Sequence, residues 1–342
     1  MQIVIIGSGI AGITFAEKTR ALNPKARITI LTQETYGYYS RPILSHGFSQ
    51  ENIEQNIVLK TFAQLEQNNI HITSGVEVTA INRKHQQIAF KTDTTQDDDT
   101  LKYDTLILAQ GSSAFIPPPF RPYRDQFFLF NNLADLKLLR QFRQPFVQSK
   151  TAANWAIIGG GLIGCELASD LATAGDRVTL FHAMDRLMER QLVPEDSETL
   201  LAALQSAGLN VLLDQSVQSF ASQGDKKIVQ AETPSSTDKF DGIIVSCGFL
   251  PRTGLALDAG LDIGRGVQVD QFLQTSDEHI YALGDVAELP NKKLYAFIMP
   301  IRSQALWLAN YLNGAETAPC SPPIFNPKAK VHGFKAANPY IF

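Results

Sequence analysis

Two glycine-rich turns are the residues of this sequence that are best suited to chemistry. They lie at 7–12 and 159–164, and each has the spacing G-x-G-x-x-G between a short apolar segment and a longer one. A helix that begins at such a turn offers a phosphate its N–H groups and the positive end of its dipole. One such turn is a weak signal. Two of them predict two bound dinucleotides, the arrangement of a flavin enzyme that a nicotinamide reduces.

In the first turn, each glycine has a separate task. Gly7 permits the tight turn, Gly9 lets the backbone approach a pyrophosphate, and Gly12 lets the helix pack close to the strand. An acid that bonds a ribose hydroxyl is expected after the next strand, and the nearest one is Glu34. The alternative is a strand, turn and helix packed for compactness alone, but the complete order of these features favours nucleotide binding.

The second turn repeats this pattern with Gly159, Gly161 and Gly164. The strand after its helix ends at His182, where an NADH site usually has an acid and an NADPH site has basic groups. His182 either contributes to this choice or is a half-exposed residue at a strand end. Arg186 could bind a 2′-phosphate or be a surface arginine. The choice between NADH and NADPH therefore stays open.

Hydrophobic periodicity predicts an α/β chain whose elements hold these turns. The first β-α-β unit has strands at 3–6 and 27–31 and a helix at 11–22, which Pro24 ends. The second β-α-β unit spans 155–181. Further strands are expected at 71–78, 87–91, 103–108, 241–246 and 280–285, and a further helix at 302–312.

The segments between these elements are expected to be irregular. Residues 38–45 read as a loop that leads into a short helix. Residues 92–100, with their run of three aspartates, read as a solvated hairpin tip rather than a cation site. Three prolines at 117–119 predict a stiff crossover between domains, and the chain from Ala315 reads as an extended tail.

Composition and charge narrow the class of protein. The 342 residues allow two or three domains, and 44% hydrophobic with 19% charged residues is typical of a globular protein. A net charge of −4 gives no reason to expect nucleic acid or membrane binding, and no apolar stretch reaches membrane-spanning length. Because no signal peptide is evident and the three cysteines are scattered, we expect a cytoplasmic protein with reduced thiols.

The spacing of cysteines and histidines argues against two other chemistries. No C-x-x-C or C-x4-C pair follows the first turn, which excludes a disulfide relay and requires an external electron acceptor. Cys165 is expected to fill space in a helix. The six histidines show no metal-ligand spacing, so no metal site is predicted.

Together these motifs resemble the FAD-dependent pyridine nucleotide-disulfide oxidoreductase superfamily, and within it the NAD(P)H:rubredoxin reductases and flavorubredoxin reductases. The resemblance reaches to about residue 314, with matching stretches at 3–12, 39–45, 103–111, 159–166, 248–252, 275–285, 299–301 and 304–305. It implies two Rossmann-like dinucleotide-binding domains. Residues 1–112 and 247–320 would form a discontinuous FAD domain, residues 113–246 an inserted NAD(P) domain, and 321–342 a tail or the remnant of a mostly missing third domain.

The resemblance also implies which residues contact the cofactors. FAD would be held by Gly7, Gly9, Ala11, Gly12, Glu34, Arg41, Pro42, Val78, Gly111, Gly284, Asp285 and Pro300. The nicotinamide nucleotide would be held by Gly159, Gly161, Gly164, His182 and Arg186, and Gly248 would also contact a cofactor. Within this set, Asp285 would bond the ribityl chain, and Gly284 would allow its close approach.

Arg41 and Glu166 are the catalytic pair that the resemblance implies. In relatives, an acid after the second turn faces a basic residue near flavin N5, and Arg41 is the matching basic residue here. Such a pair can tune the flavin potential and position the nicotinamide. The alternative for Glu166 is an acid that the N-terminus of its helix stabilises.

The implied activity is an FAD-dependent NAD(P)H reductase that passes a hydride to flavin N5 and then single electrons to rubredoxin or a rubredoxin-like iron protein. Alternatives are a ferredoxin reductase, an NADH oxidase, and a flavin-binding redox sensor without turnover. The sequence departs from the relatives at Gln110, where many have threonine, at His182, and at its end. The last departure leaves acceptor docking and oligomeric state open, and the basic residues of the tail read as solvated rather than as a docking surface for an acidic partner.

Overall fold

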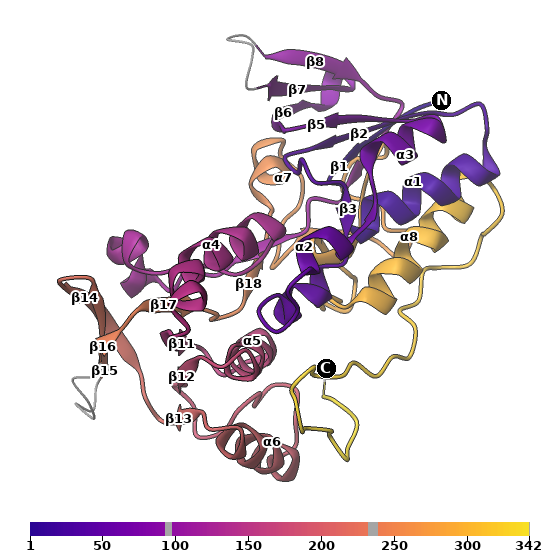
Figure 1. The fold of residues 1–342 in the computed structure, drawn as a ribbon. Coiled ribbons are helices and arrows are strands. Elements are labelled where there is room, and N and C mark those ends of the chain that lie inside the picture. The colour runs from indigo at the N-terminus through magenta and orange to yellow at the C-terminus, as the bar shows by residue number, and fades with distance from the viewer. Residues whose placement is uncertain (93–97, 232–238, 342) are drawn as a thin grey trace. The chain divides into compact units, whose positions relative to one another are not determined.

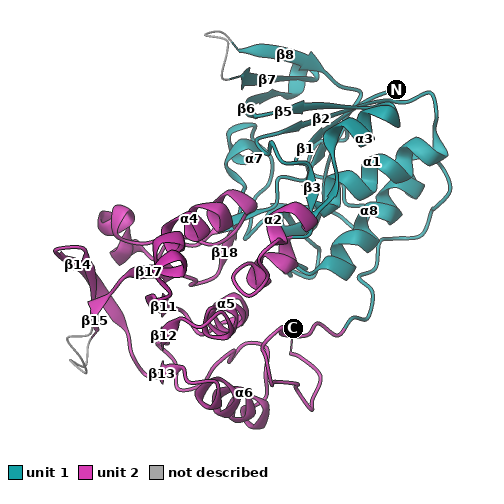
Figure 2. Cartoon of the chain, in the orientation of Figure 1, with its two compact units in different colours: residues 1–40, 58–113, 251–325 teal, residues 41–57, 114–250, 326–342 magenta. Residues whose placement is uncertain are grey.

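The protein divides into two compact units, each with its own parallel sheet (Figure 2). The structure, a computed structural model, describes residues 1–92, 98–231 and 239–341. Unit 1 comprises residues 1–40, 58–113 and 251–325, and unit 2 comprises residues 41–57, 114–250 and 326–342. The predicted α/β fold is confirmed. Asp97 and most of the expected hairpin tip lie outside the described residues.

Unit 1 is built on a five-stranded parallel sheet (Figure 1). The strand order is β20 (Ile280–Ala282), β9 (Thr105–Leu108), β1 (Gln2–Ile6), β2 (Arg27–Thr32) and β5 (Ile70–Ser74). Strands β1 and β9 are apolar and buried throughout their centres, because a parallel sheet is covered on both faces. Helices α1 (Ile10–Leu22) and α8 (Ile298–Leu312) pack side by side in this unit.

The expected single strand at 71–78 is wrong, because two strands meet there. Strand β5 ends at Ser74, and β6 (Val76–Asn82) begins a three-stranded antiparallel sheet with β7 (Gln87–Thr92) and β8 (Asp99–Lys102). Gly75 lies between them with φ of +67°, a left-handed conformation that redirects the chain. The strand expected at 87–91 is confirmed as β7.

Smaller elements complete unit 1. The expected helix at 302–312 is confirmed, but α8 begins earlier, at Ile298, and accommodates Pro300 in its first turn, where a missing N–H costs nothing. The remaining elements are β3 (Tyr38–Tyr39), β4 (Val58–Lys60), α3 (Phe62–Gln67), η2 (Arg83–His85), α7 (Gly254–Asp258), β19 (Val267–Gln268), η4 (Gly284–Val286) and β21 (Ala287–Glu288).

Unit 2 is built on a four-stranded parallel sheet. The strand order is β13 (Asn210–Leu212), β12 (Arg177–Phe181), β11 (Asn154–Ile158) and β17 (Gly242–Val245). The weak strand pattern expected at 241–246 is thus confirmed as β17. Helix α5 (Leu162–Thr173) follows β11, α6 (Pro194–Ser206) precedes β13, and β14 (Val217–Gln223), β15 (Lys226–Ala231) and β16 (Lys239–Phe240) form an antiparallel sheet.

The segment after the three prolines differs from the expected stiff crossover. The 3-10 helix η3 (Pro118–Gln126) begins within the proline run, because proline favours the first turn of a helix. Helix α4 (Leu133–Ser149) follows and was not expected. A capping box begins this helix: Asn132 Oδ1 accepts the N–H of Asp135, and the Asp135 carboxylate accepts the N–H of Asn132. In the sequence this motif is an asparagine followed three positions later by an aspartate.

Unit 2 also contains the short segments at 41–57 and 326–342. The first forms the 3-10 helix η1 (Arg41–His46) and helix α2 (Ile53–Asn56). The second is irregular, as expected for the tail. Within it the N–H groups of Ala337 and Asn338 donate hydrogen bonds of 2.8 and 2.9 Å to the Asp196 carboxylate and hold the pKa of that group below its usual value.

Strands β10 (Ser112–Ala114) and β18 (Phe249–Pro251) contain two of the five positions where the chain passes from one unit to the other. Within the described residues, none of the helices combines the length and the apolar composition that a bilayer span needs.

Candidate functional site

The first glycine turn joins β1 to α1, and two of its three glycines are packed tightly against backbone atoms. Gly7 has φ of +111°, and a Cβ there would lie 2.4 Å from the Ala109 carbonyl oxygen. A Cβ on Gly12 would lie 2.1 Å from the Gly7 carbonyl oxygen. Both distances are far inside van der Waals contact, so only glycine fits at these two positions. Gly9 is different, because no described atom beyond its chain neighbours lies within 4 Å of its Cβ position.

The open space at Gly9 lies at the N-terminus of α1. Gly9 is the N-cap residue, and among the described residues no side chain caps it and no acid occupies the first turn of the helix. The first N–H groups of α1 and the positive end of its dipole therefore meet no competing negative charge from this turn. These residues fit an adenine dinucleotide, whose pyrophosphate needs an exposed backbone and N–H donors.

Three hydroxyl groups and one carboxyl group meet where β2 ends. Thr32 Oγ1 shares a hydrogen bond of 2.8 Å with Ser8 Oγ and accepts the backbone N–H of Glu34 at 3.1 Å. The Tyr39 hydroxyl donates a bond of 2.7 Å to Glu34 Oε1. Glu34 is thus held beside the first turn, where a ribose-binding acid is expected. Sequence analysis missed Ser8 and Thr32, since a single hydroxyl carries no distinctive spacing.

A second polar group gathers beyond β9 and β20 in unit 1. Asp285 Oδ2 accepts the Ser112 hydroxyl at 2.8 Å, and the Gly284 N–H donates to Gln304 Oε1 at 2.9 Å. Gly111, before Ser112, has no described non-neighbouring atom within 4 Å of its Cβ position. Strands β1, β9 and β20 are parallel, so these groups and the first turn all lie at the carboxyl ends of the strands. Ligands of open α/β sheets bind at this end of the sheet.

Three further expected FAD contacts also belong to unit 1. Ala11 is a buried residue in the first turn of α1, and Pro300 is buried in the first turn of α8. Val78 lies in β6, opposite Phe90. Gly248, in contrast, belongs to unit 2, where its carbonyl oxygen accepts the N–H of Phe115 at 2.9 Å.

The second glycine turn repeats the geometry of the first. Gly159 has φ of +113°, and a Cβ there would lie 2.5 Å from the Ser246 carbonyl oxygen. A Cβ on Gly164 would lie 1.9 Å from the Gly159 carbonyl oxygen, whereas no described non-neighbouring atom lies within 4 Å of the Cβ position of Gly161. Within the described residues, the N-terminus of α5 also lacks a side-chain cap and a first-turn acid. This turn therefore fits a second adenine dinucleotide.

His182 is tied into the second turn rather than half exposed. Its side chain is 9% exposed, its Nδ1 accepts the Gly160 N–H at 3.0 Å, and its Nε2 lies 3.2 Å from Glu189 Oε2. Arg186 directs its guanidinium to the protein, donating bonds of 2.7 Å to the Leu192 carbonyl oxygen and 2.9 Å to that of Glu189. Glu189 therefore brings an acid to the end of β12. It stands seven positions after His182, where the sequence pattern predicts the acid.

Glu166 is a buried acid of α5 whose partners come from two distant segments. Its carboxylate accepts the Ser45 hydroxyl of η1 at 2.9 Å and the Lys330 N–H at 2.8 Å. The Lys330 ammonium bonds the Pro42 carbonyl oxygen; burial lowers the pKa of this ammonium, and the Glu166 charge partly opposes the shift. Arg41 Nη1 donates to the Asn131 carbonyl oxygen at 3.3 Å. The expected pairing of Arg41 with Glu166 stays a prediction.

Cys165, next to Glu166, is completely buried and packs as a small apolar residue. Its Sγ donates to the Gly160 carbonyl oxygen at 3.3 Å, and burial raises the pKa of the thiol far above its ordinary value. A thiol in this state is inert.

Proteins of known identity are similar to this chain in sequence. Residues 1–306 match the sequence profile of a family described as pyridine nucleotide-disulphide oxidoreductase. The rubredoxin-NAD(+) reductase of Alcanivorax borkumensis is 33% identical over 316 residues, which cover 92% of this chain and 79% of that protein. The nitric oxide reductase FlRd-NAD(+) reductase of Escherichia coli O9:H4 is 34% identical over 316 residues, covering 92% and 80%.

Solved structures agree with this relationship. An NAD-dependent persulfide reductase from A. fulgidus superimposes with a TM-score of 0.86 at 25% identity, covering 97% of this chain. The match spans 62% of that neighbour, which is less than two thirds of its length. Putidaredoxin reductase, solved in a covalent complex with putidaredoxin, has a TM-score of 0.83 at 26% identity and is covered to 79%, with 96% of this chain matched.

The fold and the two glycine turns define a dinucleotide-dependent oxidoreductase. More particularly, the chain belongs to the pyridine nucleotide-disulphide oxidoreductase family. Its cofactors are FAD and NAD(P)H. The expected superfamily is thereby confirmed.

The open and closed glycines of one turn should respond differently to a methyl group. We expect Gly9→Ala to change the unfolding free energy of the apoprotein by less than about 0.5 kcal/mol, because its Cβ meets empty space. It should nevertheless weaken FAD binding at least about tenfold, since the methyl group stands where the pyrophosphate approaches. Gly12→Ala should destabilise the fold by about 1–3 kcal/mol or more through overpacking.

Denaturant unfolding of the apoprotein and fluorescence titration with FAD measure the two effects. Gly161→Ala is the matched control, because it places the same methyl group at the second turn and should leave FAD affinity unchanged. If Gly9→Ala bound FAD as tightly as the unaltered chain, the first turn would not hold the pyrophosphate.

Proposed function

We propose that this chain is an FAD-dependent NAD(P)H reductase whose electron acceptor is rubredoxin or a rubredoxin-like iron protein. The observation that carries the proposal is the pair of open helix N-termini at Gly9 and Gly161, one in each unit. The names of the two similar reductases support the choice of acceptor. A cytosolic location, which rests on three free cysteines, is part of the proposal.

The proposed division of labour follows the two turns. Residues 1–112 and 247–320 would bind FAD, and residues 113–246 would bind NAD(P)H. The polar groups at the sheet edge of unit 1 support the first assignment, with Glu34 beside the first turn and Asp285 beyond β20. The second turn with His182 and Glu189 supports the other.

FAD held by the first turn and by the polar groups at Glu34 and Asp285 would supply hydride acceptance from NAD(P)H and release of single electrons to two acceptor molecules. The chain's part is to bind and orient. Glu166 acts as a positioning residue, because its bond to Ser45 fixes η1, the turn that begins with Arg41. Arg41 would then supply a fixed positive charge to the flavin, as the family resemblance implies.

The acid at the end of β12 favours NADH over NADPH. Glu189 Oε2 lies 3.2 Å from His182 Nε2. At this position the Glu189 carboxylate would repel a 2′-phosphate and could accept a hydrogen bond from a ribose hydroxyl. Arg186, the candidate phosphate ligand, already donates to two backbone carbonyl oxygens and to Ser197 Oγ. We therefore propose NADH as the preferred donor.

An anaerobic reaction sequence tests the proposed activity. NADH should bleach the bound flavin, and the reduced protein should be reoxidised faster by rubredoxin than by ferredoxin or air, with one NADH consumed for two rubredoxins reduced. Stopped-flow absorbance follows both steps, and Gly161→Ala serves as the control with an impaired donor site. Fastest reoxidation by air would indicate an oxidase, and a flavin that stays yellow would indicate a sensor.

Loss of the Glu166 charge should slow hydride transfer without loss of FAD. We expect Glu166→Gln to lower the limiting rate of flavin reduction by up to about 100-fold, because Arg41 is no longer held in place. The dissociation constant of NADH and the FAD content should not change. Ser45→Ala should reproduce part of the effect, because it removes the same bond to η1. The flavin reduction potential should also change if Arg41 is displaced, whereas a general loosening of the fold would leave the potential unchanged. Unchanged reduction kinetics in both variants would remove Glu166 from the mechanism.

Donor preference provides a separate test of Glu189. The unaltered chain should have a higher kcat/KM for NADH than for NADPH, and Glu189→Gln should reduce this ratio at least about fivefold, since about 1 kcal/mol of phosphate repulsion is removed. Glu198→Gln, an exposed acid of α6, is the matched control. An equal ratio in the unaltered chain and Glu189→Gln would contradict the assignment.

A further inference from the structure

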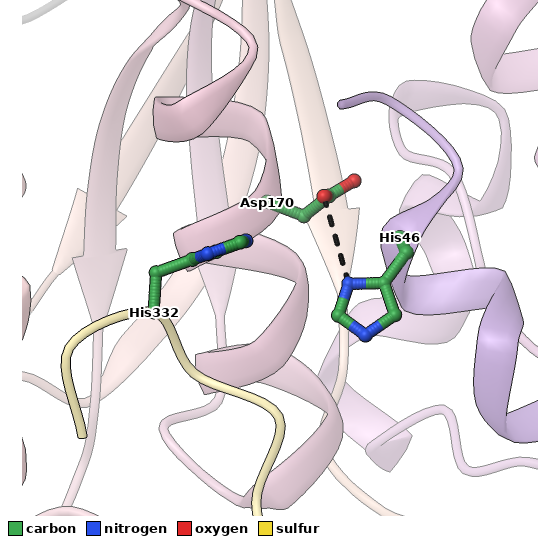
Figure 3. Close-up of side chains that lie close together, drawn as sticks. All are labelled: His46, Asp170 and His332. Carbon is green, nitrogen blue, oxygen red and sulfur yellow. Dashed lines mark ion pairs between the residues drawn. The ribbon is translucent and has the colours of Figure 1, made fainter. Parts of the chain in front are cut away.

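Three potential metal ligands from three separate segments of the chain converge in unit 2. His46 ends η1, Asp170 lies in α5, and His332 lies in the segment 326–342 (Figure 3). One ligand atom from each lies within 4.8 Å of the others. Sequence analysis predicted no metal site, because these residues come from three remote segments and show no local spacing.

Asp170 is a buried carboxylate that is held firmly in place. Its side chain is 1% exposed, and its Oδ2 accepts the N–H of Phe48 at 2.8 Å and that of Ser49 at 3.3 Å. Its Oδ1 accepts the Ser49 hydroxyl. The position is unfavourable for an acid, since Asp170 lies near the C-terminal end of its helix. A cation beside this buried carboxylate would therefore stabilise it beyond what its hydrogen bonds supply.

Among the described residues, the basic side chain within 4.0 Å of the Asp170 carboxylate is that of His46, whose Nδ1 lies 3.9 Å from Oδ1. This distance is too long for a hydrogen bond. Figure 3 shows the His46 ring facing the Asp170 carboxylate, with His332 on the other side of the acid. The two histidine rings are 6.1 Å apart between centroids and inclined at 73°.

The two histidines can adjust while their backbones stay anchored. The N–H of His332 donates a bond of 3.0 Å to Ser169 Oγ, directly before Asp170 in α5. The His332 side chain is exposed, so its ring can rotate with little displacement of neighbours, and that of His46 is 22% exposed. The rigid member of the cluster is the carboxylate, and the mobile members are the imidazoles.

We propose that His46, Asp170 and His332 form a binding site for a divalent transition-metal ion, with Zn²⁺ as the best-suited ion. Tetrahedral zinc with bonds of about 2.0–2.2 Å needs ligand atoms about 3.3–3.5 Å apart. The 3.9 Å between His46 and Asp170 reaches this range after a shift of about 0.5 Å. Two imidazole nitrogens with one carboxylate oxygen select Zn²⁺, Co²⁺ or Ni²⁺ over Mg²⁺ and Ca²⁺, and water completes the coordination.

The bound ion would fasten the segment 326–342 to α5. His332 supplies one ligand from this segment, and Lys330, two residues earlier, already bonds Glu166 through its N–H. Asp170 follows Glu166 by one helical turn. The metal and Glu166 therefore hold neighbouring points of the same segment against one face of the helix.

Metal analysis of the tag-free chain tests the proposal. After treatment with a chelator and equilibrium dialysis against Zn²⁺, we expect one ion per chain, and X-ray absorption should show imidazole nitrogens and a carboxylate oxygen. His46→Ala and His332→Ala should each weaken Zn²⁺ binding at least about tenfold. His85→Ala, an exposed histidine of unit 1, is the matched control and should bind Zn²⁺ as the unaltered chain does.

A second measurement addresses the fastening of the segment. Zn²⁺ should slow proteolysis within 326–342 in the unaltered chain and in His85→Ala but not in His332→Ala or His332→Gln, whose FAD content reports correct folding. The proposal is overturned if the chain retains no Zn²⁺, if His332→Ala and His332→Gln keep full affinity, or if the ion gives no protection. Reduction of the flavin by NADH is measured in a separate experiment. It tests the proposed function, on which the metal site does not depend.

Discussion

In each unit the helix after the glycine turn packs against the backbone of the turn itself. The Gly12 and Gly164 positions leave a Cβ only 2.1 and 1.9 Å from a carbonyl oxygen, so the helix begins as close to its strand as a polypeptide allows. This contact directs the first N–H groups of α1 and α5 beyond the sheet edge, where the open positions of Gly9 and Gly161 leave the backbone accessible. Both dinucleotide sites depend on this contact, because a displaced helix would remove its dipole from the pyrophosphate.

Helix α5 has a second task that the first helix lacks. Two buried acids, Glu166 and Asp170, lie one turn apart on it, and their partners come from segments remote in sequence, 41–57 and 326–342. Buried carboxylates are costly unless they are bonded, so the two acids require these segments to be in place. The chain thus uses the burial of charge, rather than apolar area alone, to fix two short segments of unit 2 that are remote in sequence from α5.

Patterns confined to neighbouring residues could be predicted from the sequence, and contacts between remote segments could not. Strands β1, β9 and β17, helix α1 and both glycine turns followed from apolar runs and from glycines at fixed spacing. Glu189 was missed because it returns to His182 through an irregular loop, and Ser112 because one hydroxyl has no signature. The cluster at His332 was also missed, since its geometry arises only when three segments fold together.

The placement of β20 has a consequence for how the protein is made. Strand β20 completes the sheet of unit 1 beside β9, and α8 packs on α1, although the residues of unit 2 at 114–250 are synthesised between these partners. During synthesis, the edge of β9 and one side of α1 stay uncovered until β20 and α8 have emerged from the ribosome. The inserted sheet has no such delay, because all four of its strands lie within 154–245. Unit 1, whose first strand precedes every strand of the inserted sheet, is therefore the last to close its sheet.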